Sequence, residues 1–155
     1  MSSSSPSSAS RPPALLYVED EENDVLFMRR AFTRAGLEPD LRTACDGDKA
    51  VAYLEITSDD GNDPTPDLVL LDLNLPARSG FEVLQWIRDQ PRLAALPVVV
   101  ISSSGRPEDR ERARQLGADD YLVKPASPLR LVDTVQALWA RWLDPRRNSA
   151  PLAGA

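Results

Sequence analysis

Five polar residues at the ends of short apolar runs are the strongest candidates for chemistry in this sequence. They are Glu19, Asp20, Asp72, Ser102 and Lys124. Asp72 is the most informative, because the run before it, residues 68–71, contains no polar residue. Such a run indicates a fully buried strand of a parallel sheet, and open parallel sheets bind ligands just outside the carboxyl ends of their strands. A carboxylate that leaves a buried strand needs a partner, because burying an unpaired charge is costly.

The three carboxylates of this set, Glu19, Asp20 and Asp72, predict a cation site. Carboxylates held close together repel one another and raise each other's pKa unless a cation is present. Mg²⁺ is the natural candidate, because it takes oxygen ligands and acts beside phosphate groups. Lys124 supplies a compact positive charge and Ser102 a hydroxyl donor, so the set suits a phosphoryl group carried on Asp72. Aspartyl phosphate is a known kind of covalent intermediate.

These residues meet only if the apolar runs form one sheet. Four short apolar runs and one weaker strand segment, residues 40–44, alternate with five segments of helical periodicity along the chain. The expected strands are 14–18, 40–44, 68–71, 97–101 and 120–123, and the expected helices are 23–35, 50–56, 81–89, 107–116 and 128–143. The alternation predicts an α/β fold, a doubly wound five-stranded parallel sheet of flavodoxin-like order 2-1-3-4-5. That order brings all five candidate residues to one edge of the sheet.

Composition narrows the classes of function. The length of 155 residues suggests a single domain, and the net charge of −6 argues against broad nucleic-acid binding. The single cysteine, Cys45, excludes an internal disulfide and indicates a reducing, cytoplasmic setting. Because the chain has no histidine, it cannot form a Ser-His-Asp triad or an imidazole metal site. No apolar run approaches the length of a membrane helix.

Four motifs resemble those of the receiver domain of two-component response regulators. They are Val18-Glu19-Asp20, Leu71-Asp72-Leu73-Asn74-Leu75-Pro76 with Gly80-Phe81-Glu82-Val83-Leu84 after it, Val100-Ile101-Ser102-Ser103-Ser104, and Gly117-Ala118-Asp119-Asp120-Tyr121-Leu122-Val123-Lys124-Pro125. The resemblance covers residues 14–143, with a disordered Ser/Pro arm expected at 1–13, a flexible tail at 144–155 and no output domain. It implies a phosphorelay signalling protein that catalyses only its own phosphorylation and autodephosphorylation and is not a metabolic enzyme.

The resemblance also implies a role for each acidic residue. Asp72 would accept a phosphoryl group from a sensor histidine kinase. Mg²⁺ would be held by Asp20, Asp72 and the main-chain oxygen of Asn74, with Glu19 assisting through water. Glu19 stands where the family more often has aspartate, and it keeps the carboxylate.

Three further residues would respond to the phosphoryl group. The resemblance implies that Ser102 and Lys124 contact it, and that Tyr121 turns inward when Ser102 moves. Ser102 stands where threonine is more usual, but it keeps the hydroxyl. The Lys124–Pro125 peptide bond is expected to be cis, which proline makes energetically accessible.

Three features are similar to those of stand-alone regulators paired with cyanobacterial and bacterial phytochromes. They are the long loop at 58–66, the segment 22–25, and a final helix that carries Leu138, Trp139 and Trp142. In that group the last strand and helix form a homodimer, so we expect these three residues at an interface. Packing of the two tryptophans within the chain's own core is the alternative interpretation.

Two other functions share parts of the pattern. The first is a Mg²⁺-dependent aspartyl-phosphate phosphohydrolase of the haloacid-dehalogenase type. Those enzymes place a second aspartate two residues after the nucleophile as general acid, and that position holds Asn74 here. The second is a flavodoxin-like electron carrier, but the acids that follow residues 14–18 would repel a cofactor phosphate.

Overall fold

A single five-stranded parallel sheet forms the centre of the protein. In the computed structural model, which describes residues 11–58 and 63–148, the strand order is β2-β1-β3-β4-β5. The strands are β1 Ala14–Val18, β2 Asp40–Ala44, β3 Leu68–Leu71, β4 Val98–Ser102 and β5 Asp120–Val123. Every neighbouring pair is parallel; β1, for example, pairs Leu16 with Val69 of β3. The predicted fold class and strand order are confirmed.

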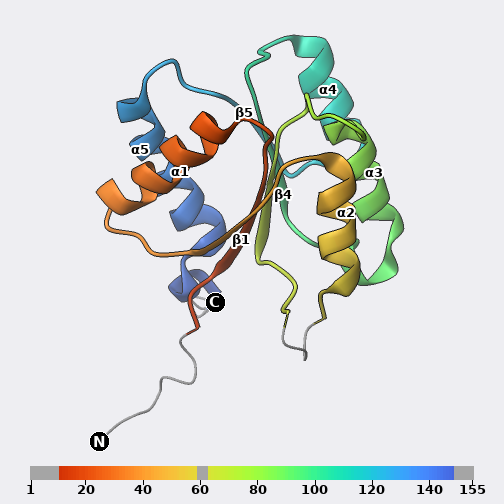
Figure 1. The fold of residues 1–155 in the computed structure, drawn as a ribbon, viewed down its shortest axis with the longest axis horizontal. Coiled ribbons are helices and arrows are strands. Elements are labelled where there is room, and N and C mark those ends of the chain that lie inside the picture. Colours follow the sequence, from red (N-terminus) through yellow and green to blue (C-terminus); the bar gives the residue numbers. More distant parts are fainter. Residues whose placement is uncertain (1–10, 59–62, 149–155) are drawn as a thin grey trace, which may run out of the picture.

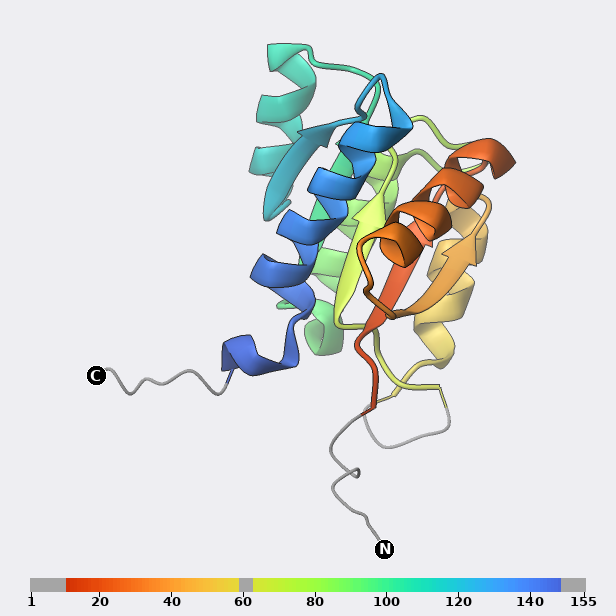
Figure 2. The same cartoon turned by 90° about the vertical axis from the view of Figure 1, so that its left-hand side faces the viewer.

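Five α-helices cover the two faces of this sheet. They are α1 Glu22–Arg34, α2 Gly47–Ile56, α3 Gly80–Asp89, α4 Pro107–Gln115 and α5 Pro128–Leu138. α1 and α5 lie side by side on one face, and α2, α3 and α4 lie on the other (Figure 1). The same pairing of α1 with α5 is seen from the side in Figure 2.

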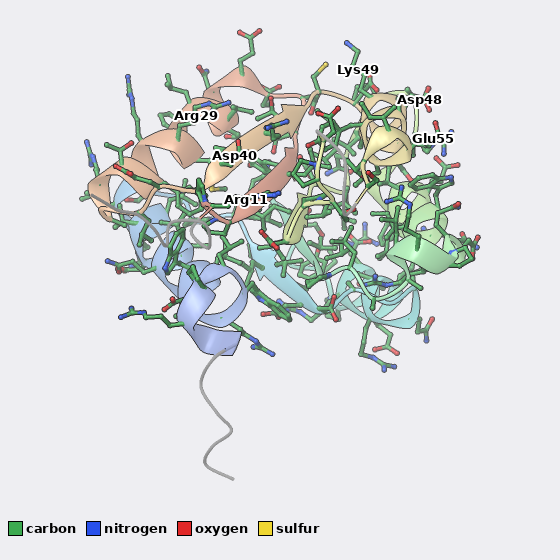
Figure 3. The ribbon with its side chains drawn as sticks, turned by 90° about the horizontal axis from the view of Figure 1, so that it is seen from below. Arg11, Arg29, Asp40, Asp48, Lys49 and Glu55 are labelled. Atoms are coloured by element: carbon green, nitrogen blue, oxygen red, sulfur yellow. The ribbon has the colours of Figure 1, made fainter. Side chains whose placement is uncertain are left out.

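The core explains why the central strands β1 and β3 are continuous apolar runs. Alternate residues of one strand point to opposite faces, and here both faces are covered by helices. Leu15 and Tyr17 of β1 pack in the cluster under α1 and α5, whereas Leu16 and Val18 pack in the cluster under α2 and α3. All four are essentially inaccessible to solvent. Charged side chains such as Arg29, Asp48, Lys49 and Glu55 lie on the outside instead (Figure 3).

Gly80 allows α3 to begin directly against the end of β3. A Cβ atom at this position would collide with the backbone carbonyl of Asp72, so the helix could not approach the strand end with any other residue. The Gly80 N–H donates to the Leu73 carbonyl at 3.0 Å, and a capping box between Ser79 and Glu82 satisfies the first turn of the helix. The glycine therefore fixes the backbone that carries Asp72.

The end of the chain differs from the expected single helix at 128–143. The α-helix ends at Leu138 and continues as a π-helical turn, Trp139–Leu143. A 3-10 turn, Pro145–Asn148, follows where a flexible tail was expected. Residues 1–10 and 149–155, where most of the arm and tail were predicted, lie outside the described residues, as do residues 59–62 of the long loop.

One backbone expectation is wrong. No peptide bond of the described residues is cis, so the Lys124–Pro125 bond is trans. The trans form is the more stable isomer of most X–Pro bonds, although by a small margin. None of the helices in the described part of the chain has the length and apolar character needed to cross a bilayer.

Candidate functional site

The carboxyl ends of β1 and β3 hold the two most deeply buried acidic residues. The sheet ladder continues one residue beyond each strand: the Glu19 N–H donates to the Ala44 carbonyl at 3.0 Å, and the Asp72 N–H donates to the Val18 carbonyl at 3.1 Å. These bonds fix both backbones where the carboxylates leave the sheet. The side chains of Glu19 and Asp72 are almost fully removed from solvent. The structure therefore places these two residues close together at one edge of the sheet.

Lys124, directly after β5, joins this pair. Its ammonium lies 2.7 Å from Glu19 Oε1, 3.1 Å from Asp72 Oδ2 and 2.9 Å from Asp24 Oδ2. Asp24, in the first turn of α1, was not among the residues predicted for the site. One cation thus bridges the ends of β1 and β3 and the start of α1, and charge-assisted hydrogen bonds of this kind are the strong ones.

Glu19, Asp20 and Asp72 form a donor set that fits a divalent cation. One carboxylate oxygen from each lies within 4.8 Å of the other two. Asp20 is exposed whereas the other two are buried, so the set opens to solvent on the Asp20 side. An all-carboxylate set with room for water suits a hard divalent ion. Asn74 is exposed beside it, and its N–H donates to Asp72 Oδ1 at 3.2 Å.

Burial sets the protonation of these groups. It raises the pKa of Glu19 to about 7; the hydrogen bond from Lys124 opposes this rise, and the charge of Asp72 adds to it. Burial alone would lower the pKa of Lys124, but hydrogen bonds to Glu19 and Asp24 outweigh it and hold that pKa above its usual value. Burial, followed by the charge of Glu19, raises the pKa of Tyr17, whose hydroxyl donates to Glu19 Oε1 at 3.2 Å. Glu19 therefore titrates near neutral pH.

The end of β4 carries a second group of linked polar residues. Ser102 is fully buried, and its Oγ accepts a hydrogen bond from the Ser104 N–H at 3.1 Å. The Tyr121 hydroxyl donates to the Ser104 carbonyl at 2.7 Å, so the tyrosine is already turned inward and largely buried. The Lys124 N–H donates to the Ser102 carbonyl at 2.8 Å. The backbone of Ser104 thus connects Ser102 with Tyr121.

This geometry agrees with the comparison to known protein families. The model of the response regulator receiver domain matches residues 15–136. The chain belongs to this family. It is therefore a response-regulator receiver protein that acts in two-component signal transduction by accepting a phosphoryl group, and the family assignment disfavours both the phosphohydrolase and the electron carrier.

Several relatives resemble this receiver over most of their length. Rcp1, a response regulator of Synechocystis sp., is 34% identical over 139 residues, which are 89% of this chain and 95% of Rcp1. "Probable methanogenesis regulatory protein FilR2" of Methanothrix harundinacea is 37% identical over 143 residues, 92% of each chain.

Solved structures give the same result. The Mn²⁺-bound form of Rcp1 has a TM-score of 0.76 and covers 86% of this chain and 96% of its own. The phosphorylated form of RcpA, described as a cyanobacterial phytochrome response regulator, is 32% identical with a TM-score of 0.77. It covers 94% of this chain and 97% of its own.

Three residues of the receiver site were missed by sequence reasoning, although each leaves a signal. Asp24 lies in the first turn of α1, and only three residues separate the start of that helix from the end of β1. Tyr17 lies two residues before Glu19 and shares its face of the strand. Ser104 leaves the weakest signal, because it acts mainly through its backbone.

The predicted interface residues lie in or against the receiver's own core. Leu138 is only 3% exposed, within the cluster under α1 and α5. Trp139 and Trp142 are partly buried and pack against the same cluster. Within one chain, these three residues therefore pack as the core-packing interpretation predicts. The tryptophans retain some exposed surface, but Leu138 does not.

The titration of Glu19 predicts a specific dependence of stability on pH. In the folded protein its pKa is raised from 4.5 to about 7, so the folded state binds the proton more tightly than the unfolded chain. Its contribution to stability is complete below about pH 4.5 and is lost as the pH rises from there to about 7. In chelator, the free energy of unfolding of the wild type should therefore fall over this range relative to that of Glu19→Gln. Urea unfolding at several pH values measures this, and parallel curves for the two proteins would contradict it.

Proposed function

We propose that this receiver accepts a phosphoryl group on Asp72 from the phosphohistidine of a sensor histidine kinase. The observation that carries the proposal is the position of Asp72: the residue is buried and follows directly after β3, and its carboxylate contacts the Lys124 ammonium at 3.1 Å. In the reaction a carboxylate oxygen of Asp72 bonds to phosphorus while the P–N bond breaks. The electron pair leaves with the imidazole, which then takes a proton from solvent.

Mg²⁺ is the proposed cofactor. Asp20, Asp72 and the main-chain oxygen of Asn74 would hold it, and Glu19 would assist through water. The Mn²⁺-bound structure of Rcp1 supports a divalent ion in such a receiver, and the carboxylate set described above fits one. When bound, the ion neutralises charge on the phosphoryl oxygens. Lys124 shares that task with its ammonium.

The signal then passes through Ser102 to Tyr121. A phosphoryl oxygen on Asp72 would accept a hydrogen bond from the Ser102 hydroxyl and draw its Oγ away from the Ser104 N–H. The Tyr121 hydroxyl donates to the carbonyl of the same Ser104. A shift of the Ser104 backbone would therefore break or re-form the hydrogen bond that holds the tyrosine. The guanidinium of Arg110, on α4, lies over the Tyr121 ring, with its carbon 4.8 Å from the ring centroid. Movement of the tyrosine would therefore alter the surface formed by α4 and β5.

The kinase of this proposal is a phytochrome, acting on the receiver in the cytoplasm. RcpA is described as a phytochrome response regulator, and its phosphorylated structure covers nearly the whole of this chain. The protein itself works as a signalling switch that catalyses only its own phosphorylation and autodephosphorylation. Its partners are proteins, with neither nucleic acid nor membrane among them.

The receiver also forms a homodimer through its last strand and helix in this proposal. β5 is an edge strand, and Val123 on it is 43% exposed. Leu129 at the start of α5 is 69% exposed, and the partly buried Trp139 and Trp142 lie at the other end of that helix. Exposed edge strands and aromatic residues favour such contacts. Leu138 would support this interface from inside its own chain.

Phosphorylation is tested first with a small donor. Incubation with acetyl phosphate and Mg²⁺ should add the mass of one phosphoryl group to the intact wild-type protein. Omission of Mg²⁺ or the Asp72→Asn substitution should abolish the gain, because the cation or the nucleophile is then missing. A gain that persists in Asp72→Asn would refute the assignment, as would the absence of any gain in folded wild-type protein.

The phytochrome pairing predicts a preference among kinases. A purified phytochrome histidine kinase, first autophosphorylated with labelled ATP, should lose its label to this receiver faster than a histidine kinase without a photosensory domain. The Asp72→Asn receiver should accept label from neither. Equal transfer rates from the two kinases would contradict the pairing while leaving phosphorylation of Asp72 intact.

The dimer is tested by molar mass in solution. Light scattering after size exclusion should give a dimer for the wild type and a monomer for the Val123→Ser, Leu129→Ser double variant, because both apolar contacts are lost. Ile56→Ser is the matched control, since Ile56 is 65% exposed on α2 at the opposite face of the sheet. A monomeric wild type, before and after phosphorylation, would contradict the proposed dimer.

A further inference from the structure

Asp24 contacts the Lys124 ammonium, and the proposed reaction gives this contact no role. Its Oδ2 lies 2.9 Å from the Lys124 ammonium, closer than Asp72 at 3.1 Å. It comes from α1, whereas the other two acceptors of Lys124 come from the ends of β1 and β3. It is not one of the three carboxylates whose oxygens gather closely enough to hold a cation.

The donors of Lys124 are fully used. An ammonium has three N–H donors. The three carboxylates of Glu19, Asp24 and Asp72 each take one, at 2.7, 2.9 and 3.1 Å. A phosphoryl oxygen that binds Lys124 must therefore displace one of these acceptors or share a donor with it.

Exposure identifies the acceptor that is easiest to displace. The side chains of Glu19 and Asp72 are 0% and 6% exposed, whereas that of Asp24 is 35% exposed. A buried carboxylate that loses its partner also loses solvation, which is costly. The carboxylate of Asp24 can exchange the ammonium for water with little loss, because it already faces solvent.

We propose that Asp24 is a positioning residue that holds the Lys124 ammonium in the unphosphorylated receiver and gives it up to the incoming phosphoryl group. The inference rests on the proposed phosphorylation of Asp72. Asp24 therefore opposes phosphorylation in two ways. It occupies a donor that the phosphoryl group needs, and its negative charge repels an anionic donor.

The test compares Asp24→Asn with wild type at saturating Mg²⁺. Beryllofluoride, a non-covalent mimic of the phosphoryl group, should bind the variant about three- to tenfold more tightly, as expected for removing one partly screened charge nearby. The initial rate of phosphorylation by acetyl phosphate should rise by a similar factor. Calorimetry measures the affinity for beryllofluoride. Mass spectrometry of the intact protein over time measures the rate of phosphorylation.

Glu22→Gln is the matched control. Glu22 is the other acidic residue in the first turn of α1, and it is exposed. Its substitution removes the same charge from the same helix terminus without touching Lys124. This variant should bind beryllofluoride as wild type does. If Asp24→Asn binds no more tightly than Glu22→Gln, or more weakly, the proposed role of Asp24 is overturned.

Salt separates this role from a purely structural one. Because Asp24 is partly exposed, added KCl should screen its charge and narrow the difference between wild type and Asp24→Asn. A difference that is independent of salt would overturn the electrostatic role. Failure of the underlying reaction gives a different result: wild type itself would then bind no beryllofluoride and gain no phosphoryl group.

Discussion

The ammonium of Lys124 among three carboxylates is the interaction on which the site depends. Without it, two buried acids, Glu19 and Asp72, would face each other with no compensating charge. Removal of one partner from a buried ion pair is strongly destabilising, because the remaining charge has neither water nor counterion. In the proposed reaction the same ammonium receives a phosphoryl oxygen. Under this proposal, stability of the unphosphorylated state and chemistry at Asp72 compete for one side chain, and the balance between them decides how readily the receiver is switched.

The fold brings the carboxyl ends of four strands, β1, β3, β4 and β5, to one edge of the sheet. Because the sheet is parallel and covered on both faces, the central strands β1 and β3 are apolar and the first polar residues follow directly after them. The order of strands places β3 between β1 and β4, so the acid of β3 is flanked on both sides. Gly80 then brings α3 against the Asp72 backbone, and α1 brings Asp24 to the same edge.

The sequence predicts the parts of this arrangement that depend on local pattern. Glu19, Asp72 and Lys124 each follow an apolar run, so their meeting at one edge could be predicted from strand order alone. Asp24 could not be assigned in this way, because its role depends on how the first turn of α1 is oriented over Lys124. The end of α5 was also missed: the spacing of Trp139 and Trp142 suits a continuing α-helix, whereas the structure forms a π-helical turn there. The isomer of the Lys124–Pro125 bond is set by a small energy difference that no sequence pattern reveals.

Chemical trapping of the phosphorylated residue tests the central claim most directly. Borohydride reduces an aspartyl phosphate to homoserine, which marks the modified position in peptide mass spectra. After treatment with a phosphodonor and Mg²⁺, homoserine should appear at position 72 alone, and it should be absent without the donor. Homoserine at position 20 or 24, or a reduced glutamate at position 19, would mean that the cluster directs the phosphoryl group to a different carboxylate. That result would contradict the roles assigned here to Asp72 and Lys124.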